Sequence, residues 1–326
     1  MTTHAKGEMV WRADPCEKTA TAKPAFPLDA LTPYALRARR KISHLLGQHE
    51  TVLRLTTQLD SAMCRRHCRT QYNAAAGFAE INFETTTHCN YRCPFCPQGI
   101  DPRPAEYMAD DLLERIIDEL AYIGFRGTVG LNLINEPLTH PHIMQFTHLV
   151  ADRLPDANIS IFTNGALLTE DMFKEFMSLP NPPYMKINDY TRQHNILPRV
   201  KTYLKHVPEH LKNTSRIRLA ERSYDEKLSN RAGNAAGPDA NAFHQRLMCT
   251  SPFQQLCIAV DGTVPLCYAD YKYQCVMGDT RTQSLLDIWT GRKFADIRRR
   301  LLETGRRGIP LCHKCDAVCL DHFDQP

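Results

Sequence analysis

Three cysteines in one short run have the spacing of an iron–sulfur cluster site. Cys89, Cys93 and Cys96 lie in the segment CNYRCPFC, with three residues between the first pair and two between the second. Cubane 4Fe–4S clusters are normally held by four cysteine thiolates. Three thiolates leave one iron without a protein ligand, and an open iron can chelate a small molecule through an amine and a carboxylate. A zinc knuckle is the alternative, although zinc sites usually combine two separated CxxC-type pairs.

The same segment, with Phe95 directly before its last cysteine, resembles the cluster motif of the radical S-adenosylmethionine (SAM) superfamily. The resemblance implies that the three cysteines hold a 4Fe–4S cluster whose open iron binds SAM. It also implies reductive cleavage of SAM to methionine and a 5′-deoxyadenosyl radical, which abstracts a hydrogen atom from a substrate carbon. In such enzymes the cofactor carries the difficult chemistry, while the protein supplies position and electrostatics.

A second segment, INEPLTHP, resembles the Gly-Gly-Glu-Pro segment of this superfamily. The resemblance implies that Glu136 and the backbone near it bind the amino group of SAM. A carboxylate suits that role because an ammonium group needs charged or polar acceptors within hydrogen-bond reach. Asn135 stands where the family usually has glycine. The alternative for Glu136 is a surface carboxylate at the end of a strand.

The resemblance assigns further SAM contacts to residues at other strand ends and loops. Phe95 corresponds to the family residue whose backbone meets the adenine edge, and Asn164 lies in a Thr-Asn-Gly turn that recurs in the family. Asn188 ends a strand where the family often places polar groups for the ribose or the carboxylate. Arg231 lies in an Asn-Arg-Ala-Gly segment and could clamp a carboxylate bidentately. Alone, the Thr-Asn-Gly segment signals only a turn, and Arg231 could be an ordinary loop arginine.

The C-terminal 80 residues contain seven cysteines. Cys249, Gly262 and Cys267 are spaced as in the opening of the auxiliary-cluster domain called SPASM, or of its shorter form, twitch. The resemblance implies that Cys249, Cys267, Cys312 and Cys315 hold a second 4Fe–4S cluster, and a zinc ribbon from the same cysteines is the alternative. The segment IAVDGTVPL predicts a β-hairpin with Asp261-Gly262 at its turn.

Several cysteines remain outside these two sets. Cys257, Cys275 and Cys319 are candidate hydrogen-atom donors or buried small hydrophobes. A thiol donor beside the substrate would favour epimerisation, whereas an auxiliary cluster that accepts an electron would favour oxidation. Cys64 and Cys68 are four residues apart, so on a helix they share a face. With His67 they form an incomplete ligand set, and a packing role is favoured.

The hydrophobic pattern predicts strands that alternate with helices, which is typical of parallel βα units. Active residues of βα barrels gather at the C-terminal ends of the strands, and the cysteine run follows the first strand. The resemblance implies an α/β fold, a partial (β/α)6 TIM-type barrel. We expect three parts, namely an N-terminal helical extension (1–75), the barrel (76–245) and a small cysteine-rich SPASM/twitch domain (246–326). The expected strands are Phe78–Thr87, Thr128–Ile134, Ile159–Thr163, Tyr184–Asn188 and Ile217–Ala220.

Composition limits the other classes of function. The chain has 326 residues, a formal net charge of +4 and 43% hydrophobic residues, so neither nucleic acid nor a membrane is an expected partner. It contains no apolar run of about 20 residues and no signal-peptide core, which predicts a cytoplasmic protein. Thirteen cysteines in that setting favour metal sites over disulfides.

We therefore expect a radical SAM oxidoreductase or epimerase that acts on a small polar metabolite, such as a sugar, cyclitol or aminoglycoside. The resemblance also implies a reducing electron donor such as flavodoxin or ferredoxin. One alternative is a maturase that modifies a ribosomally synthesised peptide. Another is a non-catalytic Fe–S or zinc protein, although such a protein would need no SAM pocket.

Overall fold

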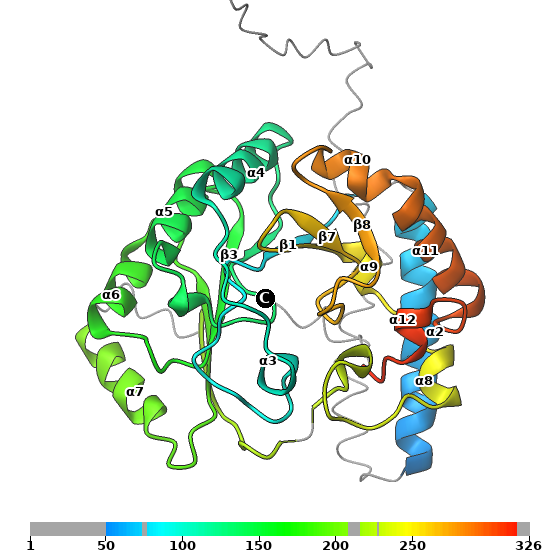
Figure 1. Ribbon diagram of the computed structural model, residues 1–326, viewed down its shortest axis with the longest axis horizontal. Helices are drawn as coiled ribbons and strands as arrows, with labels where there is room; N and C mark the ends of the chain where they lie inside the picture. Colours follow the sequence, from blue (N-terminus) through cyan, green and yellow to red (C-terminus); the bar gives the residue numbers. More distant parts are fainter. Residues whose placement is uncertain (1–49, 74–76, 208–215, 227, 318–326) are drawn as a thin grey trace, which may run out of the picture.

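A computed structural model describes residues 50–73, 77–207, 216–226 and 228–317 of the chain (Figure 1). The start of the expected N-terminal helix, near Leu31, and the candidate donor Cys319 lie outside the described residues. None of the described helices is both long and apolar enough to cross a membrane.

Six parallel strands form the central sheet, in the order β5–β4–β3–β2–β1–β6. The βα alternation in the sequence is confirmed, because helices connect the first five strands. The sixth strand comes from the segment that we expected to belong to the C-terminal domain (246–326). The sheet therefore contains strands from both the expected barrel and the expected C-terminal domain. The strands are β1 (Glu80–Phe83), β2 (Thr128–Gly130), β3 (Asn158–Thr163), β4 (Tyr184–Asp189), β5 (Ile217–Glu221) and β6 (Gln255–Ile258).

Four helices cover the outer face of the sheet: α4 (Asp110–Tyr122), α5 (Ile143–Arg153), α6 (Glu170–Ser178) and α7 (Ile196–His206). They form the arc on the left of Figure 1. In α4 the apolar residues recur at helical spacing and are buried against the sheet, which explains why this segment forms a helix here. With the outer face covered by apolar side chains, the polar side chains of the strands are left to the inner face.

The segment IAVDGTVPL forms the expected turn at Asp261-Gly262, but the prediction that its two arms pair as a β-hairpin is wrong. Gly262 has a φ of +88°, and the N–H of Ala259 donates to the carbonyl of Thr263 at 2.8 Å. The two arms join different sheets, however: β6 pairs with β1, whereas β7 (Thr263–Pro265) pairs with the antiparallel β8 (Val276–Asp279). All four residues of β6 are buried, as a strand covered on both faces requires.

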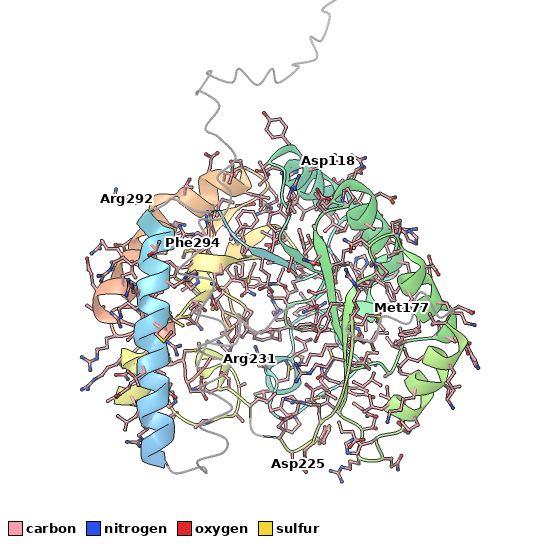
Figure 2. All side chains as sticks on the ribbon, turned by 180° about the vertical axis from the view of Figure 1, so that it is seen from behind. Asp118, Met177, Asp225, Arg231, Arg292 and Phe294 are labelled. Carbon is pink, nitrogen blue, oxygen red and sulfur yellow. The ribbon has the colours of Figure 1, made fainter. Side chains whose placement is uncertain are left out.

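The helix α2 (Glu50–Asn73) is the described part of the expected N-terminal extension, and it packs on the C-terminal segment. Arg65 donates to the carbonyl of Leu302 at 2.6 Å, and Ser61 accepts the N–H of Met248 at 2.8 Å. Leu302 belongs to α11 (Arg292–Thr304), and Met248 lies between α8 (Ala242–Arg246) and α9 (Ser251–Gln254). The same C-terminal segment also contains α10 (Leu285–Thr290) and α12 (Pro310–His313). Figure 2 shows α2 from behind, lying across this side of the molecule.

Cys64 and Cys68 face into that contact and are fully buried. Burial raises the pKa of the Cys68 thiol, so it is held as a neutral thiol. These two residues therefore pack the helix against the core, as the favoured interpretation predicted.

Candidate active site

A cavity of about 570 Å³ lies on the inner side of the sheet, at the C-terminal ends of its strands. It is lined by Cys89, Cys93 and Cys96 together with every candidate SAM contact from the sequence: Phe95, Asn135, Glu136, Asn164, Asn188 and Arg231. These residues come from five separate segments of the chain. Parallel strands bring them together because their C-terminal ends meet at one edge of the sheet.

The cysteine run folds into a tight loop that ends in the short helix α3 (Pro97–Ile100). The N–H of Cys96 donates to the carbonyl of Cys93 at 3.1 Å, and the N–H of Gly99 donates to the carbonyl of Cys96 at 2.9 Å. A Cβ on Gly99 would lie 2.1 Å from the carbonyl oxygen of Cys93. Only glycine allows this close approach, a requirement that the cysteine spacing alone did not reveal.

Burial and neighbouring thiols raise the pKa of two cysteines of the run, Cys89 and Cys93. Burial, reinforced by the neighbouring Glu136 and thiols, raises the pKa of Cys89 to about 12, although the N–H of Tyr91 opposes the shift. Burial and Cys96 raise the pKa of Cys93 to about 11. Such thiols stay protonated near neutral pH, so binding of a metal must displace their protons. The site therefore gains most of its negative charge only when it is loaded.

Glu136 is a buried carboxylate, not the surface group that was the alternative. Its side chain is 2% exposed, and burial raises its pKa to about 7. One carboxylate oxygen accepts the hydroxyl of Thr163 at 2.6 Å and the N–H of Leu138 at 3.2 Å, while the other accepts the N–H of Asn164 at 2.7 Å. No ion pair found among the described residues neutralises it, so a cationic ligand would supply the missing charge.

Asn135 and Asn164 act on the backbone of the site. The side chain of Asn135 accepts the N–H of Leu133 at 2.7 Å, and the backbone of Asn135 is not in the left-handed region, so glycine is not required there. The side chain of Asn164 donates to the side chain of Asn90 at 2.7 Å, inside the cysteine loop. Gly165 completes the turn with a φ of +72°.

The other candidate contacts lie around the rest of the cavity. The Phe95 ring centroid lies 5.2 Å from that of Tyr190, and the guanidinium of Arg231 lies 5.0 Å from the centroid of the Tyr268 ring. Figure 2 shows Arg231 near the middle of the molecule, between the barrel and the C-terminal elements. Asn188 faces the cavity from β4.

The second set of cysteines gathers beyond the barrel. Burial raises the pKa of Cys267 well above its usual range, and the neighbouring Cys312 and Cys257 add to the shift. The buried Arg306 donates to the carbonyl of Cys315 at 3.2 Å and to that of Met248, next to Cys249, at 3.4 Å. Hydrogen bonds of Arg306 therefore connect the segments that carry the first and the last predicted ligands, Cys249 and Cys315.

Two candidate hydrogen-atom donors, Cys257 and Cys275, are absent from the described lining of the cavity. Cys257 is 1% exposed, and its sulfur lies 3.7 Å from the side-chain oxygen of Gln255. Gln255 lines the cavity, but within the described structure neither Cys257 nor Cys275 does. Only the three cysteines of the run contribute thiols to the described lining.

The sequence analysis missed the polar floor of the cavity. Asn82 donates to Glu80 at 2.8 Å, and Glu80 lies opposite Gln255 in the pairing of β1 with β6. Further polar side chains line the cavity: Asn132, Lys186, Arg222 and Tyr268. A period of two along the strands would have placed several of them on the inner face, yet nothing in the sequence showed that this face was hollow.

Comparison with known proteins identifies the two parts of the site. Residues 83–217 match the radical SAM superfamily model, and residues 249–316 match the SPASM model, an iron–sulfur cluster-binding domain. The chain belongs to the radical SAM superfamily. The matches cover the cysteine run and the four predicted auxiliary cysteines, and they indicate two Fe–S clusters in this radical SAM protein.

Two curated relatives share sequence with this radical SAM chain. The S-adenosyl-L-methionine-dependent 2-deoxy-scyllo-inosamine dehydrogenase of Niallia circulans is 23% identical over 249 residues, which is 76% of this chain and 96% of the relative. A tungsten-containing aldehyde ferredoxin oxidoreductase cofactor-modifying protein of Pyrococcus furiosus is 35% identical over 99 residues, or 30% of this chain and 27% of that protein.

Solved structures share the fold. The crystal structure of BtrN in complex with AdoMet and 2-DOIA has a TM-score of 0.64 and 24% identity, covering 74% of this chain and 94% of that one. BtrN in an open conformation has a TM-score of 0.58 and 21% identity, covering 74% of this chain and 93% of that one. The fold expected from the cysteine motifs is therefore confirmed.

Proposed function

We propose that this radical SAM protein is a dehydrogenase that oxidises a hydroxyl-bearing carbon of a small aminocyclitol or amino sugar. The observation that carries the proposal is the cavity, which places the three cysteines and Glu136 above a floor of amide, carboxylate and ammonium side chains. The relative that matches over nearly its whole length is a SAM-dependent dehydrogenase of 2-deoxy-scyllo-inosamine.

The chain's own residues would bind and orient SAM. We assign Cys89, Cys93 and Cys96 as cluster ligands, which leaves the amine and carboxylate of SAM to complete the coordination. When bound, the cluster and SAM supply a 5′-deoxyadenosyl radical that removes a hydrogen atom from the substrate. Glu136 would accept an N–H of the iron-bound SAM amine, because its buried carboxylate is already fixed by three donors and no ion pair among the described residues occupies it.

The floor of the cavity favours a substrate with both hydroxyl and amine groups. Glu80 can accept an ammonium or hydroxyl, and Lys186 can donate to a hydroxyl oxygen. The volume of about 570 Å³ lies in the range of small-molecule sites. Both features favour a small polar metabolite over a peptide substrate.

The positions of the thiols favour oxidation over epimerisation. An epimerase needs a hydrogen donor at the substrate, and the three cysteines of the run are the only thiols in the described lining. A dehydrogenase removes two electrons and two protons. Hydrogen abstraction from carbon takes one of each, and the hydroxyl proton would pass to water or to a carboxylate of the cavity lining. The site of Cys249, Cys267, Cys312 and Cys315 would hold an acceptor for the second electron.

The test is deuterium transfer under anaerobic conditions after cluster reconstitution. Protein, a chemical reductant and SAM are incubated with 2-deoxy-scyllo-inosamine deuterated at each carbinol carbon in turn. We expect one deuterium in 5′-deoxyadenosine and a ketone product, both absent in Cys93→Ala. If 5′-deoxyadenosine forms without deuterium from any aminocyclitol or amino sugar tested, the substrate class is wrong. Solvent deuterium at an inverted carbon would show epimerisation instead.

A further inference from the structure

A segment that follows Cys267 reaches back to the loop of the first cysteine run. We call Cys267–Cys275 the clasp. The N–H of Asp270 donates to the carbonyl of Cys267 at 3.0 Å, and the carboxylate of Asp270 accepts the N–H groups of Gln274 and Cys275 at 2.8 and 2.9 Å. Asp270 is buried. These bonds fold the clasp into a turn that begins at a predicted cluster ligand.

Consecutive side chains of the clasp contact the residues after Cys96. The hydroxyl of Tyr271 lies 2.5 Å from the side-chain oxygen of Gln98 and 2.9 Å from the carbonyl of Asp101. Lys272 forms an exposed ion pair with Asp101 at 2.7 Å. Gln98 is buried and lines the cavity, so the contact reaches the wall of the SAM site.

Arg103 is enclosed by the clasp and the end of β1. Its guanidinium carbon lies 4.3 Å from the centroid of the Tyr271 ring and 5.1 Å from that of Tyr273, which is close enough for cation–π attraction. Arg103 also pairs with Glu84, which is 1% exposed and accepts the hydroxyl of Tyr273. Removing one member of a buried pair leaves an uncompensated charge, so each group of this network depends on the others.

Contacts with the clasp fix the position of α3, which the bonds within the cysteine loop do not fix. The bonds within α3, from Gly99 to Cys96 and from Asp101 to Pro97, fix the local shape of the helix. Bonds from Tyr271 and Arg103 fix its position against the barrel and the C-terminal segment. Tyr273 has a φ of +51°, a strained value for a tyrosine, and the surrounding contacts hold it there.

We propose that Tyr271 and Arg103 are positioning residues that couple the two cysteine sites. Occupancy at Cys267 fixes the clasp, and the clasp holds the loop after Cys96 in the conformation that binds SAM. The proposal rests on the proposed function in one respect, because the first cysteine run must be the SAM site.

The first test is Tyr271→Phe, which removes the hydroxyl but keeps the ring beside Arg103. Hydrogen exchange of the amides of Gly99, Ile100 and Asp101 is measured in the reconstituted protein. We expect exchange about tenfold faster than in the parent chain, the scale of one lost buried hydrogen bond. Lys272→Ala is the matched control: it removes an exposed ion pair of the clasp and should change nothing.

The second readout is spectroscopic. We expect SAM to shift the electron paramagnetic resonance signal of the reduced protein less in Tyr271→Phe than in the parent chain. The KM for SAM should rise, while kcat at saturating SAM stays near that of the parent. Arg103→Lys keeps the charge but not the planar stacking, and should give the same change. Unaltered exchange and an unaltered SAM response in both variants would overturn the positioning role.

The coupling itself is tested with Cys267→Ser. If occupancy at Cys267 fixes the clasp, this variant loses iron from the second site and speeds exchange of the same three amides. Loss of that iron with unaltered exchange would refute the coupling. These exchange measurements do not require turnover. A parent protein that never responds to SAM would refute the proposed function, and the exchange data would still report on the clasp.

Discussion

A carboxylate oxygen of Glu136 accepts the backbone N–H of Asn164 at 2.7 Å, which ties the loop after β2 to the turn after β3. The same carboxylate accepts the hydroxyl of Thr163 at 2.6 Å. The two sequence motifs that were assigned to SAM separately are thus one hydrogen-bonded unit. That unit presents a single buried negative group to the cavity.

Replacing Glu136 by Gln should weaken SAM binding about 10- to 100-fold, because a hydrogen bond to a charged group contributes about 1.5–3 kcal/mol. The amide keeps the shape of the side chain but lacks the negative charge that strengthens its hydrogen bond to the SAM amine. SAM affinity is measured by titration of the reduced, reconstituted protein. Glu170→Gln, an exposed carboxylate on α6, is the control and should bind like the parent. Unaltered affinity in Glu136→Gln would remove this residue from the SAM site.

SAM binding should also depend on pH through Glu136. Burial raises its pKa to about 7 in the unliganded protein, and the ionised carboxylate is the stronger acceptor for the N–H groups of the SAM amine. Affinity should therefore be full above about pH 7.5 and fall by up to about tenfold per pH unit below 7. The binding curve is measured from pH 6 to 8. Glu136→Gln should have a flat profile over that range, and an equally steep profile in both proteins would assign the effect to another group.

The raised pKa also predicts a change in stability without ligand. A carboxyl whose folded-state pKa lies above its unfolded value binds more protons in the folded state. Stability of the metal-free protein should therefore decline as the pH rises from about 5 to 7, by at most a few kcal/mol. Urea unfolding at several pH values measures this. In Glu136→Gln the decline should be smaller, and an identical decline would contradict the assignment.

Gly99→Ala should disrupt the first cysteine site alone. The added Cβ would lie 2.1 Å from the carbonyl oxygen of Cys93, so the loop must shift. Iron content after reconstitution should fall from about eight to about four per chain, since one cubane is lost. Gly77→Ala is a matched control, because a Cβ there meets nothing within 4 Å. Full iron content in Gly99→Ala would mean that the loop tolerates the shift.

Arg306→Met should disrupt the second site. The side chain is 1% exposed and donates to the carbonyls of Met248 and Cys315. Each buried carbonyl left without a partner costs about 1–3 kcal/mol. We expect a lower midpoint of unfolding and loss of iron from the second site, with SAM cleavage retained. Arg307→Met, its exposed neighbour, should match the parent, and equal behaviour of the two variants would contradict this role.

The motifs identified the chemistry because their geometry is local. The spacing of Cys89, Cys93 and Cys96 within one loop determines which thiols can share a cluster. Glu136 and Asn164 each directly follow a predicted strand, and parallel strands must bring their C-terminal ends to one edge. The first five parallel strands, and the placing of Glu136 and Asn164 near the cysteine run, could therefore be predicted from the sequence.

Other features depended on contacts between distant segments. The pairing of β6 with β1 replaced the expected hairpin, and all four residues of β6 are buried at that edge of the sheet. The exclusion of Cys257 and Cys275 from the cavity lining could not be inferred from their positions along the chain. Both results depend on which face of each segment turns inward, and the packing of the whole core sets that orientation.

The sequence by itself determined that this chain carries a three-cysteine cluster motif. The resemblance implied that Glu136 contacts SAM, and only the fold placed its carboxylate in the same cavity as the cysteines. Only the tertiary structure brought Tyr271 into contact with Gln98, which is 173 residues away in the sequence. It also formed the cavity on the inner face of the sheet, which Glu80 and Lys186 line. The physical reason is that the ligands of such a motif lie within a few residues of one another, so their spacing in the sequence limits how far apart they can be. A cavity and a coupling contact exist only after loop closure over the whole chain has brought distant side chains together.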